Sequence, residues 1–377
     1  MNNTDLVFKN LIEIGQDSFI GVPCSYFNGI INSFYKYNKL FIANNEGEAV
    51  AIAAGRKLAG GNPVVFFQNS GFGNALNPIT SLILTNKIPI LFMISLRGDT
   101  RLKDEPQHTI MGKVTKKILD EIGIKNQTLD SNINLKRKFK KISQILNNGE
   151  SYALIVRKNF FEKVQNLTSL KKTKPQKVKY ISKNTGGKIK REDSLKIIKK
   201  NISGSSCVVT STGYLSREIY SLGDSEQNFY MVGAMGCSLA ISLGISTIIK
   251  KSKIFCIDGD GALLMRLGVM TNIFNKNSKN LIHILINNES HSSTGGQYTN
   301  SQNINFLKIA DACGFKNVAC CNSISELKNV LNLMKKTVGP NFLEIKVRDG
   351  KFDSLLRPSI SPNQVYKRFS NFLKALK

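Results

Sequence analysis

Residues 254–265 read IFCIDGDGALLM, and residues 281–291 read LIHILINNESH. Each stretch begins with an apolar run that predicts a buried strand, and the strands end at Gly259-Asp260-Gly261 and at Asn287-Asn288. Glycines let backbone amides approach a phosphate closely, while a carboxylate and a side-chain carbonyl supply the hard oxygen ligands that Mg²⁺ prefers. A Gly-Asp-Gly turn alone is more often an ordinary strand-to-helix connection, but the Asn pair twenty-six residues later favours a metal-diphosphate site.

The rest of the chain alternates between strand-like and helix-like segments. In the first half, apolar segments rich in β-branched or aromatic residues occur at 19–22, 64–68, 89–95 and 152–156, separated by helical patterns such as 49–59 and 76–85. The second half predicts strands at 207–210, 229–232, 253–257, 281–286 and 342–347, and helices at 238–249, 262–275 and 324–336. Both halves are therefore predicted to be α/β domains with a doubly wound parallel sheet, whose binding residues lie at the carboxyl ends of strands.

A basic segment separates the two halves. Between Lys171 and Lys200 there are twelve Lys and Arg residues against two acids, together with Pro175, Gly186 and Gly187. This composition, with little apolar periodicity, is typical of a solvated linker. We therefore predict a first domain over 1–165, a basic linker over 166–190 and a second domain over 191–377.

The charge balance raises the question of nucleic acid. The chain has 53 Lys and Arg residues, 26 Asp and Glu residues and a net charge of +27, and basic proteins attract phosphate backbones without a dedicated motif. The charge is concentrated in the predicted linker and otherwise spread along the chain, so nucleic-acid binding is not expected as the main role. The sequence contains no apolar run of eighteen residues and no signal-peptide pattern after Met1, which predicts a cytoplasmic protein without a membrane segment.

Residues 45–55 read NEGEAVAIAAG and predict a helix that starts with an acidic residue, Glu46. An acid at this position is favoured by the helix macrodipole alone, which gives Glu46 a purely structural interpretation. Combined with Gly259-Asp260-Gly261 and Asn287-Asn288, however, this helix resembles the thiamine-diphosphate enzymes. The resemblance implies a first domain that binds the pyrimidine ring, a second that binds diphosphate and Mg²⁺, and a Glu46 that drives the pyrimidine tautomer whose amine deprotonates the thiazolium carbon.

Three further stretches are similar to one family within that class. They are QNSGFGNALNP at 68–78, the segment from Arg97-Gly98-Asp99 to the Lys-Asp-Glu-Pro-Gln-His run at 103–108, and NNESH at 287–291 followed by Gly295-Gly296-Gln297. They resemble the phosphonopyruvate decarboxylase family. The resemblance covers nearly the whole chain, is weakest at about 163–190, and implies decarboxylation of 3-phosphonopyruvate to phosphonoacetaldehyde and CO₂.

The same resemblance implies a set of ligands for Mg²⁺ and for the cofactor. Asp260 and Asn288 are expected to bind Mg²⁺ by side chain and Ser290 by its carbonyl, with Asn287 as the alternative to Asn288. Met235 aligns with the apolar residue that wedges between the two cofactor rings, although a core methionine is an equal interpretation. Further cofactor contacts are expected from Ser211, Thr212, Gly213, Gly233, Gly259, Gly261 and Ala262.

His108 follows a loop of charged residues and is expected to face the keto acid, where it would orient the carboxylate or relay the proton that quenches the carbanion. His291 lies just past the metal-binding turn and is expected to reach the active site as the other catalytic histidine. Ser292 departs from the Asp that usually follows the equivalent of His291, which makes rate and substrate preference less secure than cofactor binding. His283 is predicted to be structural, since it alternates within a buried strand. The candidate cations for the phosphonate are Arg97, Lys103 and Arg217, each of which has solvation as its ordinary alternative.

The class implies a homo-oligomer, at least a dimer, with active sites between subunits. The alternative enzyme is a sulfopyruvate decarboxylase, whose substrate carries a sulfonate. That family commonly divides the two halves between separate chains, so a fused chain and the run at 103–108 favour the phosphonate. A catalytically idle protein that binds cofactor or nucleic acid is a third possibility, against which Glu46 and Asp260 both count.

Overall fold

The computed structural model of the protein describes residues 2–129, 134–164, 178–183, 186–275, 278–348, 352 and 354–377. The chain forms two compact units, Met1–Lys171 and Lys172–Lys377. Much of the predicted linker, residues 166–177 and 184–185, lies outside the described residues. Each unit is built on its own parallel sheet, as predicted.

The first unit contains a six-stranded sheet in the order β2-β1-β3-β4-β6-β5, in which every neighbouring pair is parallel. Its strands are β1 (Ser18–Gly21), β2 (Leu40–Ile42), β3 (Pro63–Gln68), β4 (Leu91–Ser95), β5 (Lys125–Thr128) and β6 (Tyr152–Val156). Its helices are α1 (Asn3–Glu13), α2 (Asn28–Lys36), α3 (Glu46–Leu58), α4 (Phe72–Pro78), α5 (Thr109–Glu121) and α6 (Leu135–Asn147). Short helical turns are η1 (Ser25–Phe27), η2 (Asn69–Gly71), η3 (Ile79–Leu84) and η4 (Pro106–His108).

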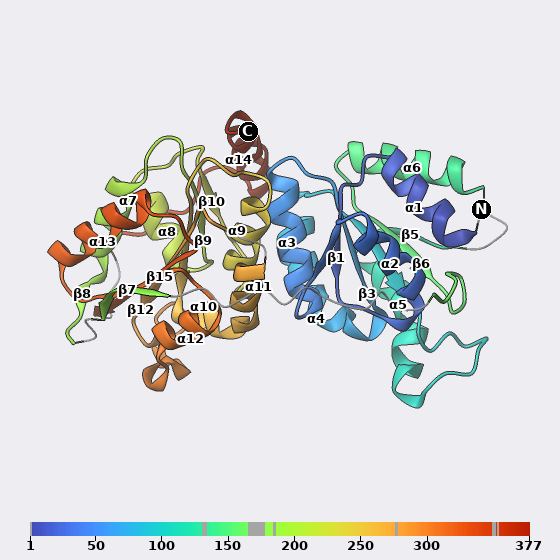
Figure 1. Ribbon diagram of the computed structural model, residues 1–377, viewed down its shortest axis with the longest axis horizontal. Coiled ribbons are helices and arrows are strands. Elements are labelled where there is room, and N and C mark those ends of the chain that lie inside the picture. The colour runs from blue at the N-terminus through green and yellow to red at the C-terminus, as the bar shows by residue number, and fades with distance from the viewer. Residues whose placement is uncertain are drawn as a thin grey trace. The chain divides into compact units, whose positions relative to one another are not determined.

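Helices cover both faces of this sheet (Figure 1). On one face, α1, α2 and α6 form a continuous core with alternate strand residues, in which the rings of Phe19 and Phe34 stack at 3.7 Å between centroids. On the other face lies α3, which contacts β1 and β3. Residues 46–55 of α3 are all buried, because its many Ala and Gly residues let neighbouring backbone approach closely. This burial holds the start of α3, and with it Glu46, against the sheet.

The second unit contains an eight-stranded sheet whose main order is β10-β9-β11-β12-β16-β15-β7, with β8 beside β16. Its strands are β7 (Lys179–Lys183), β8 (Ile189–Lys190), β9 (Cys207–Thr210), β10 (Asn228–Tyr230), β11 (Ile254–Gly259), β12 (Leu281–Asn287), β15 (Asn317–Cys321) and β16 (Asn341–Arg348). Its helices are α7 (Arg191–Asn201), α8 (Tyr214–Ser221), α9 (Ser238–Ser246), α10 (Asp260–Met265), α11 (Met270–Asn275), α12 (Phe306–Ala312), α13 (Ile324–Lys336) and α14 (Pro362–Ala375). The short turns η5 (Leu267–Val269) and η6 (Asn300–Asn303) and the antiparallel hairpin of β13 (Ser290–His291) and β14 (Gln297–Tyr298) complete the unit.

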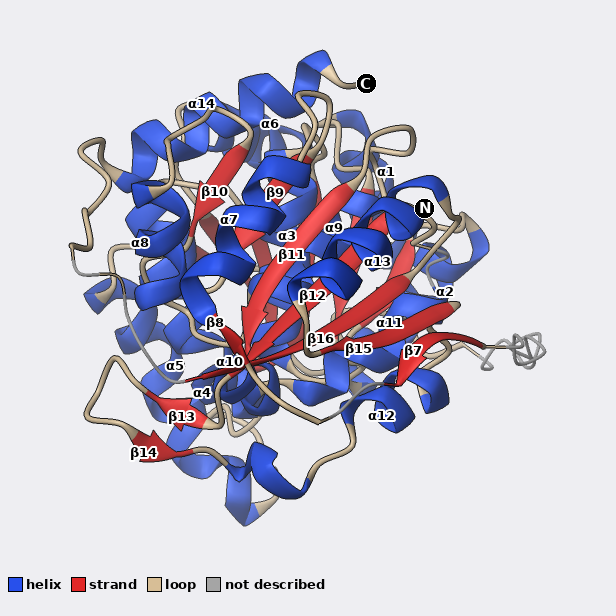
Figure 2. Cartoon of the chain, turned by 90° about the vertical axis from the view of Figure 1, so that its left-hand side faces the viewer, coloured by secondary structure: helices blue, strands red, loops and turns tan. Residues whose placement is uncertain are grey.

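The parallel arrangement brings β11 and β12 side by side, with Asp258 opposite Leu285 and Gly259 opposite Ile286. Figure 2 shows these strands running toward one edge of the sheet, where α10 begins and the hairpin of β13 and β14 lies. The residues after β9, β10, β11 and β12 therefore meet at this edge, as expected for a doubly wound sheet.

Three predicted segments differ from the structure. The segment 179–183, predicted as linker, is the edge strand β7, which pairs with β15. Its residues are exposed or only half-buried, so its sequence is as polar as that of a solvated linker. The helix predicted over 262–275 is two helices, because Arg266 leaves the helical conformation at φ −140°. The helix predicted over 76–85 begins at Phe72, and from Ile79 it continues as a π-helical turn after Pro78, which has no N–H to donate.

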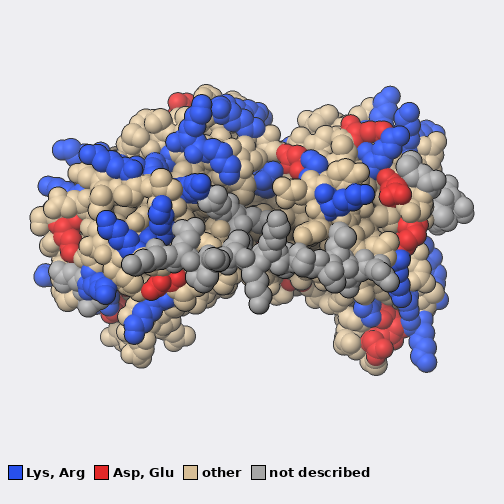
Figure 3. Space-filling model, in the orientation of Figure 1, with Lys and Arg blue, Asp and Glu red and all other residues tan. Residues whose placement is uncertain are grey.

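Basic side chains are spread over the surface of both units. On the face drawn in Figure 3, Lys and Arg side chains occur on each unit with Asp and Glu side chains between them. Within the described part of the chain, no helix has both the length and the apolar character needed to cross a bilayer.

Candidate active site

The carboxyl edge of the second sheet contains a small polar cavity of about 80 Å³. It brings together residues that follow β9, β10, β11 and β12. Of the predicted site residues, the cavity is lined by Ser211, Thr212, Met235, Gly259, Asp260, Gly261, Ala262, Asn288, Ser290 and His291. Gly213 lines the neighbouring cavity, and Gly233 lies two residues before Met235 without lining either of these cavities.

Asp260 begins α10 and is 2% exposed. Its Oδ2 atom accepts hydrogen bonds from the Thr299 and Ser301 hydroxyls, the second at 2.7 Å. These two hydroxyls also contact each other at 2.6 Å, so the carboxylate is fixed from one side by residues of the segment after β14. Sequence reasoning missed both residues, since an isolated Thr or Ser in a loop carries no signal of its partner.

The two asparagines after β12 have different environments. Asn287 Nδ2 donates to Glu344 Oε1 at 2.8 Å, and Asn287 Oδ1 accepts from the Glu289 N–H at 3.1 Å. Asn288 lines the cavity, and its Nδ2 donates to Ser292 Oγ at 2.6 Å. Asn288 lines the cavity and Asn287 does not, so this placement favours Asn288 over Asn287 as the residue next to a metal.

The residues around Asn287 are electrostatically unusual. Burial raises the pKa of Glu344, and the N–H group that Asn287 donates to it opposes this shift in part. Glu344 is 3% exposed. The Asn287 side chain is therefore needed to satisfy a buried acid, which is a structural role.

The donor set at the cavity fits a hard divalent cation and a phosphate group. Asp260 supplies a full negative charge, and oxygen atoms of Asn288 and Ser290 lie in the same lining. The Ser290 hydroxyl is buried and has no hydrogen-bond partner among the described residues, which is the state of a polar atom that awaits a bound group.

His291 lies directly over Gly261. A Cβ atom at residue 261 would stand 2.5 Å from His291 Cε1, so only glycine leaves room for the ring. The ring therefore reaches the cavity that Asp260 lines. Ser292 also lines this cavity.

Met235 is presented by a turn after β10. Ala234 has a φ of 51° and Gly236 a φ of 86°, and the first value is unusual for a residue with a side chain. Met235 is half-buried and lines the cavity rather than the core. This placement is consistent with a residue that contacts a ligand.

In the first unit, Glu46 lies in the first turn of α3 and is 9% exposed. Its Oε2 atom accepts a hydrogen bond from Asn74 Nδ2 at 2.9 Å. A Cβ atom at Gly71 would stand 2.0 Å from Glu46 Oε1, so the turn η2 passes directly over the carboxylate. Asn74 and Gly71 both belong to the quoted stretch at 68–78, but their contact with Glu46 could not be inferred from spacing.

The same turn η2 reaches His108. Ser70 Oγ lies 2.8 Å from His108 Nδ1, and the imidazole is 8% exposed at the end of η4. Gln68 Nε2 donates to Ser70 Oγ at 3.0 Å. The first unit therefore brings the predicted residues Glu46 and His108 to the two sides of one short turn.

Arg97 is paired within its own loop. It forms a two-pronged ion pair with Asp104, in which Nη2 lies 2.6 Å from Oδ1 and Nε lies 2.8 Å from Oδ2. The hydrogen bonds from Arg97 hold the pKa of Asp104 well below its usual range, and the backbone N–H groups of Gly98 and Glu105 add to this effect. The guanidinium also lies over the Tyr26 ring. Arg97 therefore stabilises its own loop, which favours its structural interpretation over a contact with the phosphonate.

His283 is fully buried on β12, and its ring packs edge-on against Phe342 at 5.3 Å between centroids. Its Nε2 atom lies 3.7 Å from Asp258 Oδ2. This core position agrees with the structural interpretation of His283.

Comparison with known proteins gives this site a class. The model of the thiamine pyrophosphate enzyme N-terminal TPP binding domain matches residues 1–119, and that of the C-terminal TPP binding domain matches residues 204–345. A crystal structure of benzoylformate decarboxylase from Polynucleobacter necessarius has the same fold, with a TM-score of 0.74 over 93% of this chain and 100% of that one at 10% identity. The fold and the site define a thiamine pyrophosphate enzyme.

A narrower relationship follows from full-length relatives. The chain is 34% identical to a phosphonopyruvate decarboxylase of Streptomyces viridochromogenes over 98% of this chain and 94% of that protein. It belongs to the phosphonopyruvate decarboxylase family. A sulfopyruvate decarboxylase of Methanosarcina acetivorans is 27% identical over 100% of this chain and 99% of its own length. That relative also spans both halves in one chain, so fusion alone does not distinguish the two families, and the higher identity to phosphonopyruvate decarboxylase carries the assignment.

Proposed function

We propose that the protein decarboxylates 3-phosphonopyruvate to phosphonoacetaldehyde and CO₂ with thiamine diphosphate and Mg²⁺, a step of phosphonate biosynthesis. The observation that carries this proposal is the cavity in which Asp260, Asn288 and Ser290 converge with the loops after β9 and β10. Membership of the phosphonopyruvate decarboxylase family supports the choice of substrate.

Asp260, Asn288 and Ser290 would hold Mg²⁺, the first two by side chain and the third by its carbonyl. Thr299 and Ser301 keep Oδ2 of Asp260 in place, which fixes the direction in which the carboxylate presents its charge. Contacts with the diphosphate are assigned to Ser211, Thr212, Gly213, Gly259, Gly261 and Ala262, and contacts with the rings to Gly233 and Met235.

Glu46 is assigned to the pyrimidine ring. When bound, thiamine diphosphate supplies an electron sink for the carbanion that forms as a 2-oxo acid loses CO₂. The task of Glu46 is to hold a proton at the pyrimidine, and the hydrogen bond from Asn74 fixes the orientation of its carboxylate. The backbone of Gly71 lies close to Oε1, and the carboxylate fits there because residue 71 has no side chain.

His108 and His291 are assigned to the substrate. Because Ser70 engages Nδ1 of His108, Nε2 is the ring atom that can exchange a proton with the keto acid or orient its carboxylate. His291 lines the Asp260 cavity, and it is assigned to the substrate on that ground.

The resemblance that assigns Glu46 and Asp260 also implies assembly. We propose a homo-oligomer, at least a dimer, in which Glu46 of one subunit acts on cofactor held through Asp260 of another. A cytoplasmic location remains a prediction from the sequence.

The experiment offers phosphonopyruvate, sulfopyruvate and pyruvate in parallel to purified protein loaded with thiamine diphosphate and Mg²⁺, and measures CO₂ release. We expect kcat/KM for phosphonopyruvate to exceed that for pyruvate by about 100-fold or more, since pyruvate leaves the charged donors of the site unpaired. A higher kcat/KM for sulfopyruvate than for phosphonopyruvate would identify sulfopyruvate as the substrate instead. Absence of CO₂ release from all three would contradict the proposed function.

A further inference from the structure

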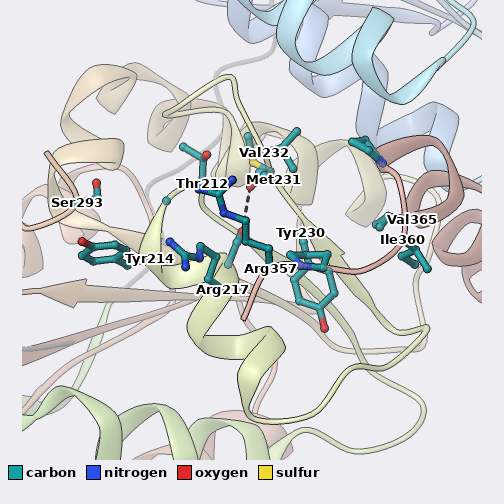
Figure 4. Close-up of a pocket in the computed structure, with 14 residues that line it drawn as sticks. Thr212, Tyr214, Arg217, Tyr230, Met231, Val232, Ser293, Arg357, Ile360 and Val365 are labelled. Atoms are coloured by element: carbon teal, nitrogen blue, oxygen red, sulfur yellow. Dashed lines mark hydrogen bonds between the residues drawn. The ribbon is translucent and has the colours of Figure 1, made fainter. Parts of the chain in front are cut away.

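A second cavity of about 470 Å³ lies at the carboxyl ends of β9 and β10 (Figure 4). It shares Thr212, Tyr214 and Ser293 with the smaller cavity that Asp260 lines, so the two are adjacent. Its remaining wall comes from α8, from residues 231–232 after β10 and from the segment 357–365 that leads into α14.

The charge of this cavity is positive. Arg217 and Arg357 both line it (Figure 4), and none of the described residues that line it carries a carboxylate. Arg217 Nε is buried and has no hydrogen-bond partner among the described residues. A buried guanidinium N–H without a partner carries a free-energy cost that a bound anion would remove.

Arg217 also positions Arg357. Its Nη2 atom donates to the Leu355 carbonyl at 2.7 Å, two residues before Arg357 in the chain. This bond attaches the segment that carries Arg357 to helix α8. Two guanidinium groups that approach from separate elements are thus held at one cavity.

The hydroxyls of the cavity divide into two groups. Ser216 Oγ donates to the carbonyls of Ser211 and Met231, and the Tyr230 hydroxyl pairs with Asp224 and Asn228, so both have structural partners. Thr212, Tyr214 and Ser293 lie instead at the boundary between the two cavities. They line the route from the cofactor cavity to the guanidinium groups.

We propose that this cavity is the subsite for the phosphonate group of the substrate, with Arg217 and Arg357 as the residues that determine specificity. The inference rests on the proposed function. A guanidinium presents paired N–H donors that match the oxygens of a phosphonate, and two such cations suit a dianion better than the monoanionic sulfonate. Thr212, Tyr214 and Ser293 line both cavities, so the proposed subsite adjoins the cavity assigned to Mg²⁺ and the cofactor. Arg357 was missed in the sequence because its segment has no motif or periodicity.

The test compares Arg357→Ala, Arg357→Lys and Arg217→Ala with wild type in the holoprotein. Lys374→Ala, which removes an exposed cation of α14 that lines neither cavity, is the matched control. One readout is the Kd of methylphosphonate by calorimetry, and the other is KM for phosphonopyruvate and for pyruvate. Thermal unfolding of each variant shows whether the fold is kept.

We expect Arg357→Ala to raise the Kd of methylphosphonate and KM for phosphonopyruvate by about tenfold or more, with Arg357→Lys between it and wild type. KM for pyruvate should stay unchanged, since pyruvate has no group for the subsite. Lys374→Ala should match wild type throughout.

The inference is overturned if wild type turns over phosphonopyruvate while Arg357→Ala keeps the wild-type Kd and KM. Equal losses for phosphonopyruvate and pyruvate would also overturn it, because they would show general damage. If Arg217→Ala unfolds because it loses its bond to Leu355, the Kd and KM of Arg357→Ala alone test the inference. Failure of the proposed function is a separate result, namely absence of phosphonopyruvate turnover in wild type.

Discussion

Gly71 leaves the space that the Glu46 carboxylate occupies. A Cβ atom at residue 71 would stand 2.0 Å from Oε1 and 2.1 Å from the carboxyl carbon of Glu46, far inside any van der Waals contact. Since Asn74 holds the other oxygen at 2.9 Å, the carboxylate is confined between one turn and one helix. Its orientation is thus fixed by backbone from η2 as well as by a side chain.

The confinement of Glu46 predicts the effect of one added methyl group. Gly71→Ala should displace the carboxylate and lower decarboxylation by about 100-fold, while cofactor binding through Asp260 changes little. The matched control is Gly73→Ala, since nothing lies within 4 Å of a Cβ there. Gly73 lies within α4, so alanine should stabilise the fold by about 0.5–1 kcal/mol without loss of activity. Equal activity of the two variants in a steady-state assay would contradict the proposed placement of Glu46.

The two asparagines predict opposite outcomes. Asn288→Ala should weaken Mg²⁺ binding to the cofactor-loaded protein by about tenfold or more, with a small effect on stability. Asn287→Ala should instead cost about 1–3 kcal/mol in the free energy of unfolding, because it removes the hydrogen-bond donor from the buried Glu344 carboxyl. Calorimetric Mg²⁺ titration and chemical denaturation measure the two effects. If Asn287→Ala is the variant that loses Mg²⁺, the ligands must be exchanged.

The Arg97–Asp104 pair predicts a pH dependence of stability. The pKa of Asp104 lies below its ordinary value of 3.8, chiefly because of the hydrogen bonds from Arg97. A folded-state pKa below the unfolded one gives a stabilisation that is complete above the unfolded pKa and is lost as pH falls through the folded pKa. Arg97→Met should therefore cost about 3 kcal/mol in the free energy of unfolding at pH 7. The difference from wild type should shrink below about pH 4.

An exposed pair in the same unit serves as the control. Lys125 and Glu150 form a salt bridge with both side chains about half exposed, so Lys125→Met should cost less than about 1 kcal/mol. Denaturant unfolding between pH 3 and pH 7 gives both values. An Arg97→Met cost that does not change with pH would mean that Asp104 keeps an ordinary pKa.

Local patterns predicted the fold and the meeting of two candidate site residues at one edge of a sheet. Apolar runs followed by Gly-Asp-Gly or Asn-Asn report both the strand and its carboxyl end, so the convergence of Asp260 and Asn288 could be expected. Strand β7 was not predicted, because an edge strand with lysines and half-buried positions has the same composition as a linker.

The remaining site residues depend on contacts that spacing does not encode. Arg97 is a cation of the kind that binds a phosphonate, so the sequence alone suggests a ligand. In the folded chain, the loop after β4 brings Asp104 next to Arg97, and the two form an ion pair. Arg357 contributes to the second cavity because Arg217 binds the Leu355 carbonyl, 138 residues away in sequence. Residue spacing encodes neither pairing, so both were accessible only from the structure.

The role of Glu46 is tested most directly by hydrogen–deuterium exchange at the thiazolium carbon of the bound cofactor, without substrate. Glu46→Gln preserves the size of the side chain and an acceptor for Asn74, and as a helix-start residue it should cost only a few tenths of a kcal/mol in stability. With both proteins saturated in cofactor and Mg²⁺, we predict exchange about 100-fold or more slower in Glu46→Gln than in wild type. An exchange rate equal to that of wild type would return Glu46 to the role of a helix-start acid and contradict the central claim.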